Sequence, residues 1–333
     1  MNSAVAILNW NGIDLLKKFL PSVVEFTPNS TSIYVVDNGS TDNSIELIKS
    51  NFPSVKLIDN GANLGYAGGY NAALKKLDEE LVVLLNSDAE VSKGWLEPLI
   101  SRLKSSNEIA ACQPKIKAFH DKPMFEYAGA CGGMIDYLGY PFCRGRIFDT
   151  CELDSGQYDA PMKVFWATGT CLAVKREAFQ EVGGLDEDFF AHMEEIDLCW
   201  RLQRAGHDIW VEPSSTIYHL GGGTLNAQSP RKTFLNFRNG LAMITKNASM
   251  TRLIWLIPTR LVLDGMAGVK FLLTGMPGHT WAVIKAHFSF YFGVVKWIRK
   301  RRGMFEQVPQ IWSESIVWAY FVKDKKKFSD LNF

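Results

Sequence analysis

Four short apolar runs in the first ninety residues each end in side chains that could bind a polar ligand. These side chains are Asn9 and Asn11 after the first run, Asp37 after the second, Asn63 after the third, and Asn86 and Asp88 after the fourth. Ligands bind at the carboxyl ends of the strands in an open parallel sheet. The side chains are therefore expected to converge on one edge. For any single loop, Asn, Asp, Gly and Ser can also be simple turn formers.

Two residues could bind a metal ion. Asp88 emerges from the apolar run 81–85, and its carboxylate could bind Mg²⁺ or Mn²⁺ that bridges a diphosphate, since hard cations prefer oxygen ligands. His219 ends a short extended segment and could add an imidazole ligand, which would favour Mn²⁺. Taken alone, a histidine such as His219 is more often a hydrogen-bonded structural residue than a metal ligand.

A cluster of carboxylates, Glu194, Glu195 and Asp197, lies at the start of a helix predicted over residues 194–205. Negative charge at that end is favourable to the helix dipole, so helix capping alone could explain the cluster. Adjacent helical side chains point about 100° apart, and Glu194 and Glu195 therefore cannot both face one cleft. One of them could act as a general base.

The common motifs for nucleotides and zinc are missing from the sequence. The glycines of residues 61–69 lack the GxGxxG spacing directly after the first strand, and no GxxxxGK[ST] loop or HExxH motif occurs. The six cysteines form no CxxC pair or Cys/His zinc spacing, which fits reduced, cytosolic thiols. A bound nucleotide would therefore rely on carboxylates, amides and a divalent ion.

The elements that must position these residues follow an alternating pattern. Strands are predicted over residues 4–8, 33–36, 55–58, 81–85 and 109–112, and amphipathic stretches separate the first four. This alternation predicts an α/β fold on a mostly parallel sheet. Two more extended pieces are expected at 208–211 and 216–219. Residues 118–162 fit no pattern, and such long segments are usually functional loops or poorly ordered.

Together these stretches resemble the family 2 inverting glycosyltransferases of GT-A fold, especially the bacterial rhamnosyltransferase-like members. The matching segments, in order along the chain, are AILNWNG (6–12), VVDNGSTDNS (35–44), NLGYAGGYNAAL (63–74), LLNSDAEV (84–91), TGTCLAVKREAFQEVGGLDEDFFAHMEEIDLCWRLQRAG (168–206), and His219 with the glycines 221–223. The resemblance covers about residues 3–246. It implies a GT-A catalytic domain over 1–246 and a helical, basic extension over 247–333.

The resemblance also implies roles for residues on the donor side of the site. Asp37 is similar to the family's base-binding aspartate, and Asn86 lies where the first residue of a DxD-type motif would meet the ribose or the donor sugar. Asn9 and Asn11 would border the nucleotide. The remaining two donor-site residues, Asn63 and Asn71, would shape the donor pocket.

For the chemistry, the resemblance implies that Asp88 is a metal ligand, that His219 helps to hold the metal, and that Glu195 is the catalytic base. The sequence departs from the family pattern at several points. Glu194-Glu195 stands where Glu-Asp is common, so the base is one methylene longer, and Glu194 stays open as an alternative. Asn86 replaces the first aspartate of a strict DxD motif.

Composition excludes several other classes of protein. The chain has 333 residues, of which 47% are hydrophobic and 21% charged, so it is neither intrinsically disordered nor a coiled coil as a whole. The net charge of +1 argues against a dedicated nucleic-acid binder. This balance is a cancellation, because residues 1–250 carry 23 Lys and Arg against 30 Asp and Glu, whereas residues 251–333 carry 13 against 5.

The pattern of apolar and basic residues in the C-terminal part predicts contact with a membrane surface. Apolar residues recur at helical spacing, and basic clusters follow at 296–302 and 325–327; the apolar residues are Trp281, Ile284, Phe288, Tyr291, Phe292 and Val295. An apolar face beside cations is typical of a helix lying in an anionic membrane interface. Packing on the catalytic domain is the alternative. The longest charge-free stretch of this C-terminal part, 271–284, is shorter than the ~20 residues of a membrane span.

These observations predict an inverting transferase that moves a sugar from a nucleotide-diphospho-sugar, with dTDP-rhamnose implied by the resemblance. The acceptor would be a glycan or a polyprenyl-diphosphate-linked sugar, and the protein would be cytoplasmic and peripheral on the inner face of a bacterial membrane. A nucleotidyltransferase is an alternative that has no use for a base at Glu195. A catalytically silent nucleotide-sugar-binding scaffold at the membrane is another.

Overall fold

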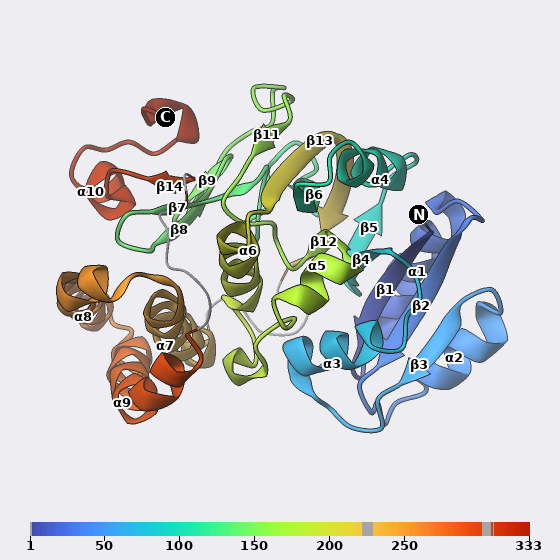
Figure 1. Ribbon diagram of the computed structural model, residues 1–333, viewed down its shortest axis with the longest axis horizontal. Coiled ribbons are helices and arrows are strands. Elements are labelled where there is room, and N and C mark those ends of the chain that lie inside the picture. Colours follow the sequence, from blue (N-terminus) through green and yellow to red (C-terminus); the bar gives the residue numbers. More distant parts are fainter. Residues whose placement is uncertain (1, 222–228, 302–307, 309) are drawn as a thin grey trace.

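A computed structural model describes residues 2–221, 229–301, 308 and 310–333, and its centre is a nine-stranded sheet (Figure 1). The strand order is β11-β13-β6-β12-β4-β1-β2-β3, and β5 also pairs with β13. The strands are β1 (Ser3–Asn9), β2 (Thr31–Asp37), β3 (Lys56–Asp59), β4 (Leu81–Asn86), β5 (Ala89–Val91), β6 (Ile109–Ala118), β11 (Met162–Lys163), β12 (Cys171–Lys175) and β13 (Asp208–His219). Strands β1 to β4 are parallel, whereas β12 is antiparallel to both of its neighbours.

Helices cover both faces of the sheet, which confirms the predicted α/β architecture. One face packs against α1 (Ile13–Phe26), α2 (Ser44–Asn51) and α4 (Leu96–Lys104), and the other against α3 (Gly65–Leu74), α5 (Arg176–Glu181) and α6 (Glu194–Arg204). Strands covered on both faces are apolar throughout rather than alternating. Accordingly, every residue of β4 except its last is buried.

The segment 118–162 contributes most of a second, five-stranded sheet. Its strands are β7 (Gly133–Asp136), β8 (Pro141–Cys143), β9 (Arg146–Ile147), β10 (Thr150–Cys151) and the C-terminal β14 (Ile311–Trp312), which pairs in parallel with β7. Strands of two to four residues are too short to show a hydrophobic period, which explains why the sequence left this segment unassigned.

A C-terminal helical region is present as expected. It comprises α8 (Met250–Leu273), α9 (Pro277–Arg299), α10 (Ile316–Phe321) and a turn of 3-10 helix, η2 (Phe328–Asp330). The helix before it, α7 (Pro230–Asn247), ends at the predicted boundary, and another 3-10 turn, η1 (Glu187–Phe189), precedes α6. Figure 1 shows α7, α8 and α9 gathered beside α6. None of the helices within the described residues is long and apolar enough to cross a membrane.

Candidate active site

Asp88 and His219 meet at the carboxyl edge of the sheet. Asp88 lies in the turn between β4 and β5, and β5 pairs antiparallel with the end of β13 so that Ala89 lies opposite His219. The backbone N–H of Leu220 donates to the carbonyl of Asp88 (3.0 Å), and His219 Nε2 lies 3.1 Å from Asp88 Oδ1. Both side chains are buried. The structure thus joins the two metal-ligand candidates.

The surroundings of His219 are strongly acidic. Burial opposes protonation of the imidazole, but its contacts with Asp88 and Glu126 outweigh burial and raise the pKa of His219 to about 10. Oxygen and imidazole ligands in a negatively charged site suit Mg²⁺ or Mn²⁺. Among the described residues, no group of three or more His, Cys, Asp and Glu side chains is arranged to hold a metal. Asp88 and His219 would therefore need diphosphate oxygens or water to complete the coordination.

Asp37, the candidate base-binding residue, is completely buried at the end of β2. Its Oδ1 accepts a hydrogen bond from Asn9 Nδ2 (3.0 Å), and its Oδ2 accepts one from the backbone N–H of Ser40 (2.8 Å). Asn9 also donates to Ser40 Oγ (3.1 Å). These bonds join the loops that follow β1 and β2 into one rigid edge.

Asn11 and Asn63 hold neighbouring loops at the same edge. Asn11 has a positive φ of 50°, and its Oδ1 accepts a hydrogen bond from the backbone N–H of Thr41 (2.7 Å). Asn63 Oδ1 accepts one from the N–H of Gly65 (2.9 Å), at the start of α3. Asn63 therefore forms a local turn, whereas Asn11 joins the loops that follow β1 and β2. Contact of either side chain with a nucleotide stays a prediction.

Asn71 lies farther from the strand ends than the other candidates for the donor site. Its amide donates to the carbonyl of Leu185 (2.8 Å) and to Glu187 (3.1 Å), and its Oδ1 accepts from the N–H of Leu185 (3.0 Å). These bonds tie α3 to the segment that precedes the carboxylates of α6. Asn86 ends β4, and its backbone N–H donates to the carbonyl of Thr170 (2.9 Å).

The two candidate bases begin α6 in an unusual backbone. Three residues just before the helix, Phe190, His192 and Met193, have φ values of 65°, 69° and 72°, the left-handed region that non-glycine residues rarely adopt. Backbone strain of this kind clusters at functional sites. The sequence gives no indication of this left-handed backbone, because none of the three positions is a glycine.

Burial raises the pKa of both carboxyls, Glu194 and Glu195, and the charge of Glu195 raises that of Glu194 further. In each of them, Oε2 is buried and has no hydrogen-bond partner among the described residues. Burial raises the pKa of Tyr66, and the charges of Glu194 and Glu195 add to this effect; the Tyr66 hydroxyl donates to the carbonyl of Gly169 (2.7 Å). A carboxyl with a raised pKa and an unpaired oxygen suits a general base.

Sequence reasoning missed Asn239, which holds the strained segment in place. This fully buried residue of α7 donates from Nδ2 to the carbonyls of Phe189 (3.0 Å), Ala191 (2.9 Å) and His192 (2.8 Å). Its neighbour Arg238 donates to the carbonyl of Phe189 as well (3.1 Å). A polar residue on the buried side of an amphipathic helix was the available signal.

Glu126 was missed as well, because it lies in the unassigned segment 118–162. Its carboxylate lies 3.3 Å from His219 Nδ1, on the other side of the imidazole from Asp88. The glycines that follow His219 in the sequence motif are only partly visible: Gly221 is described, whereas residues 222–228 lie outside the described part.

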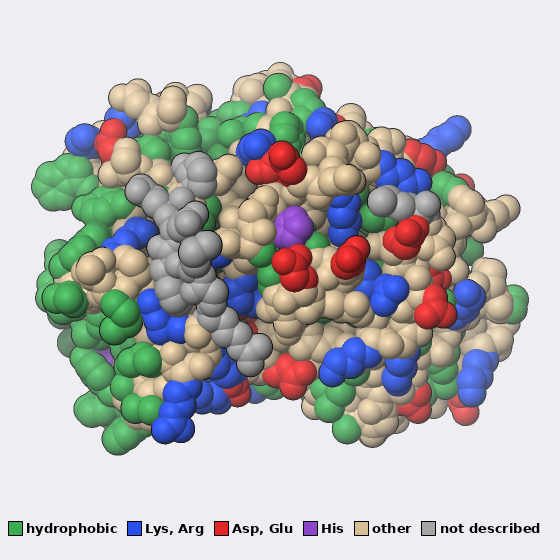
Figure 2. Space-filling view, in the orientation of Figure 1, with side chains coloured by type: hydrophobic (Ala, Val, Ile, Leu, Met, Phe, Trp, Pro, Cys, Tyr) green, Lys and Arg blue, Asp and Glu red, His purple; other side chains and the backbone are tan. Residues whose placement is uncertain are grey.

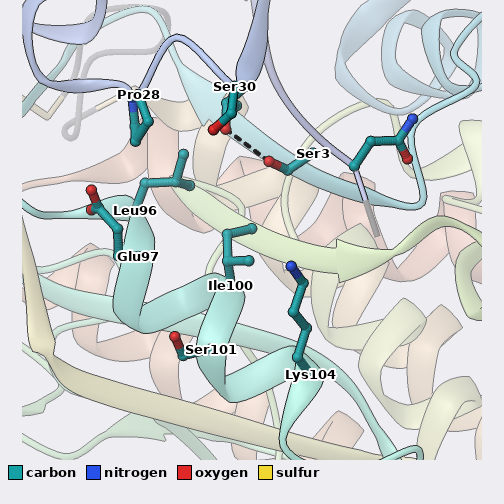
Figure 3. A pocket seen from close by; sticks show the side chains of 10 residues that line it. Ser3, Pro28, Ser30, Leu96, Glu97, Ile100, Ser101 and Lys104 are labelled. Atoms are coloured by element: carbon teal, nitrogen blue, oxygen red, sulfur yellow. Dashed lines mark hydrogen bonds between the residues drawn. The ribbon is translucent and has the colours of Figure 1, made fainter.

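A separate surface pocket lies at the opposite ends of the strands. It has a volume of about 390 Å³ and is lined by residues of α4 and of the starts of β1 and β2, including Ser3, Ser30, Leu96, Glu97 and Lys104 (Figure 3). Ligands of open α/β sheets bind at the carboxyl ends of strands. This pocket is therefore remote from the candidate active site.

A mostly parallel sheet covered by helices on both faces, with Asp88 and His219 together at its carboxyl edge, is the arrangement expected of a GT-A fold. A family model described as Glycosyl transferase family 2 matches residues 4–183, more than half of the chain, and the chain belongs to that family. The predicted family and fold are thereby confirmed, and the protein is a glycosyltransferase.

Individual relatives agree with this assignment. The chain is 31% identical over 226 residues to N-acetylglucosaminyl-diphospho-decaprenol L-rhamnosyltransferase of Mycobacterium tuberculosis, covering 63% of this chain and 73% of that protein. It is 25% identical over 245 residues to the low-salt glycan biosynthesis hexosyltransferase Agl10 of Haloferax volcanii, covering 71% and 73%.

Two solved structures share the fold at low sequence identity. GalNAc-T7 with UDP, GalNAc and Mn²⁺ has a TM-score of 0.58 at 19% identity, covering 75% of this chain and 48% of that one. The mannosyltransferase PcManGT from Pyrobaculum calidifontis, with GDP-Man and Mn²⁺, has a TM-score of 0.53 at 15% identity, covering 90% and 83%.

Proposed function

We propose that this glycosyltransferase moves a sugar, with inversion, from a nucleotide-diphospho-sugar to a hydroxyl of a lipid-linked or polysaccharide acceptor in a metal-dependent reaction. The observation that carries the proposal is the placement of the Asp88–His219 pair at the carboxyl edge of the sheet. The carboxyls at the start of α6, each with one oxygen that lacks a hydrogen-bond partner among the described residues, would supply the general base.

The residues present fit a divalent cation. Asp88 and His219 would hold Mg²⁺ or Mn²⁺, and the bound cation would stabilise the negative charge of the departing nucleoside diphosphate. Asp37, Asn9 and Asn86 would line the nucleotide and sugar of the donor. The Mn²⁺ of two structural neighbours supports a divalent cation without distinguishing Mn²⁺ from Mg²⁺.

Glu195 would take the proton of the acceptor hydroxyl. As that oxygen forms a bond to the anomeric carbon, the bond from this carbon to the diphosphate oxygen breaks, and the electron pair leaves with the nucleoside diphosphate. One base suffices for such an in-line displacement, whereas a glycosidase generally needs an acid and base pair. A single displacement inverts the anomeric carbon. Glu194 is the alternative base.

The acceptor and donor are proposed from the relatives. One curated relative transfers L-rhamnose to N-acetylglucosaminyl-diphospho-decaprenol, which supports a rhamnosyl donor such as dTDP-rhamnose and a polyprenyl-diphosphate-linked acceptor. Family membership and the raised pKa of Glu195 both favour a base-assisted sugar transfer over the nucleotidyltransferase alternative.

Peripheral placement on a membrane would bring the enzyme to such an acceptor. Of the exposed large hydrophobic side chains in the described part, all but five lie at or after Met250. Phe288 and Phe292 are 59% and 88% exposed on α9. Figure 2 shows hydrophobic side chains crowded over the end of the molecule where α8 and α9 lie. An apolar surface of this extent is typical of a protein or membrane contact.

A panel of nucleotide-sugar donors with Mn²⁺ or Mg²⁺ tests the proposal, with release of nucleoside diphosphate as the measurement. We expect one donor to be consumed only when an acceptor is present. Asp88→Ala should reduce the transfer rate by a factor of about 10² or more, since removing a catalytic charge-stabilising group costs that much. Unchanged transfer by Asp88→Ala would refute the metal role of Asp88.

A further inference from the structure

Glu126 lies beside the proposed metal pair and takes no part in the reaction as described so far. It is buried, and its Oε2 accepts a hydrogen bond from the backbone N–H of Ala128 (2.5 Å). The loop that carries it runs back along β6, because the N–H of Glu126 donates to the carbonyl of Ile116 (3.1 Å). The carboxylate is thus fixed in position by the backbone around it.

The two ring nitrogens of His219 face different carboxylates. Nε2 lies 3.1 Å from Asp88 Oδ1, and Nδ1 lies 3.3 Å from Glu126 Oε2. The second contact is at ion-pair distance without hydrogen-bond geometry, and within the described ranges Nδ1 has no hydrogen-bond partner. A buried Nδ1–H without an acceptor is costly, and the Glu126 carboxylate is the group placed to supply one.

We propose that Glu126 is a positioning residue that holds the Nδ1–H side of His219, so that Nε2 is presented to a divalent cation beside Asp88. The inference rests on the proposed metal role of Asp88 and His219. Histidines that bind metals almost always donate their other ring N–H to a carboxylate, carbonyl or water, which fixes the tautomer and the ring orientation.

The geometry favours this role over that of a third ligand. Glu126 and Asp88 contact different nitrogens of the same imidazole, so the ring stands between the two carboxylates. The described residues contain no three-residue metal cluster. Gly221, two residues after His219, lies close to the same carboxylate, since a Cβ at this glycine would lie 3.1 Å from Glu126 Oε1.

Titration of the full chain with Mn²⁺ alone, followed by electron paramagnetic resonance, tests the role without an assay of activity. Glu126→Met keeps the side-chain volume but cannot accept a hydrogen bond, and we expect it to weaken Mn²⁺ binding about 10- to 100-fold. Glu126→Gln retains an acceptor oxygen and should lie within a few-fold of the native protein. Pulsed spectra should show the coupling of a histidine nitrogen to Mn²⁺ in the native protein and lose it in His219→Ala.

Glu90→Gln is the matched control, because Glu90 is a partly exposed carboxylate that pairs with Lys122 on the surface. It should bind Mn²⁺ as the native protein does. Native affinity and native nitrogen coupling in Glu126→Met would overturn the inference, provided that Asp88→Ala still loses binding. If Asp88→Ala and His219→Ala also bind normally, the proposed metal site itself is wrong. Should Glu126→Met fail to fold, equal loss of affinity in a folded Glu126→Gln and in His219→Ala would overturn it instead.

Discussion

The α/β region buries polar side chains at its candidate active site, whereas the C-terminal helices expose large apolar ones. At the carboxyl edge of the sheet, polar residues such as Asp37 and Asp88 are buried, and β4 beneath them is an apolar strand covered on both faces. On α8 and α9, large apolar residues such as Ile254 and Phe292 are exposed. Burial of polar groups is costly and is found at functional sites, whereas exposed apolar faces are found at contact surfaces. This difference supports the proposed division of the chain into a catalytic region and a membrane-attachment region.

Cations of the C-terminal region also make contacts within the protein, which is the alternative that the sequence left open. In the basic cluster 296–302, Lys296 pairs with Asp188 (2.5 Å), and Lys300 pairs with Asp186 (2.5 Å) and Asp188. Arg301 donates to carbonyls of α7 and the residue after it, and Arg302 lies outside the described residues. Part of the basic cluster therefore fastens α9 to the loop before α6.

Removing the general base should have the largest effect. We expect Glu195→Gln to reduce transfer by about 10² to 10⁴, because general-base assistance contributes that much. Donor binding, followed by thermal shift, should stay intact. The pH profile of native transfer should rise through the pKa of Glu195, which burial raises to about 7, because only the ionised carboxylate can accept the proton.

Glu194→Gln serves as the comparison for this variant. Loss of transfer in Glu194→Gln, with native rates in Glu195→Gln, would assign the base to Glu194 instead. A pH profile that stays flat between pH 5 and 8 in the native enzyme would argue against a base whose pKa is near 7.

Loosening the strained segment should have the next largest effect. Asn239→Ala removes the amide that binds three carbonyls of residues 189–192, and we expect kcat to fall about ten- to a hundred-fold, since small misplacements of catalytic groups cost that much. The KM for the donor should change little, because the Asn239 amide donates to residues 189–192 and the donor is proposed to bind at the ends of β1, β2 and β4. Asn51→Ala, on the exposed end of α2, is the control.

A merely structural role for Asn239 would predict a different result. Asn239→Ala would then lower the melting temperature while kcat, measured well below that temperature, stayed native. The kinetic and thermal measurements together distinguish the two roles.

The sequence predicted the sheet and the pair Asp88–His219 better than the geometry around them. Long apolar strands and strong turn residues carry a local signal, and the two short pieces at 208–211 and 216–219 proved to be one bulged strand, β13. The left-handed segment before Glu194 carries no such signal, because tertiary bonds from Asn239 impose it. Local patterns cannot reveal a conformation that is held from a distant helix.

The same limit applies to the C-terminal helices. Their spacing showed an apolar face on α9, but nothing local indicated that Lys300 and Asp186 would pair across 114 positions. The domain division at 246 and 247 stays a prediction. It must accommodate β14, which joins the sheet formed by residues 133–151.

Polar substitutions on α9 should weaken binding to membranes without changing the rate of sugar transfer. We expect the double variant Phe288→Ser and Phe292→Ser to bind anionic vesicles at least about tenfold more weakly, because each buried aromatic side chain contributes about 1.5–3 kcal/mol. Transfer to a short, water-soluble acceptor should be unchanged. Cosedimentation with vesicles measures the binding.

Leu153→Ser is the matched control, since Leu153 is an exposed apolar residue outside the C-terminal helices. Lys270, Lys285 and Arg299 remain exposed, so added salt should weaken binding only in part. Equal vesicle binding by the double variant and the native protein would exclude this face of α9 as the attachment surface.

The ion pairs between α9 and the loop before α6 should give the smallest effect. Lys300→Gln is expected to lower the free energy of unfolding by about 1 kcal/mol, because Lys300 is partly exposed and Lys246 still pairs with Asp186 (2.5 Å).

Burial opposes ionisation of Asp186, but Lys246 and Lys300 outweigh it and lower its pKa to about 2. The stabilisation is therefore complete above the ordinary value of 3.8 and is lost as the pH falls towards 2. Urea unfolding at pH 7 and at pH 3 measures the difference between the variant and the native protein, which should shrink at the lower pH. A difference that stays constant would mean that Lys300 acts through packing of its aliphatic stem rather than through its charge.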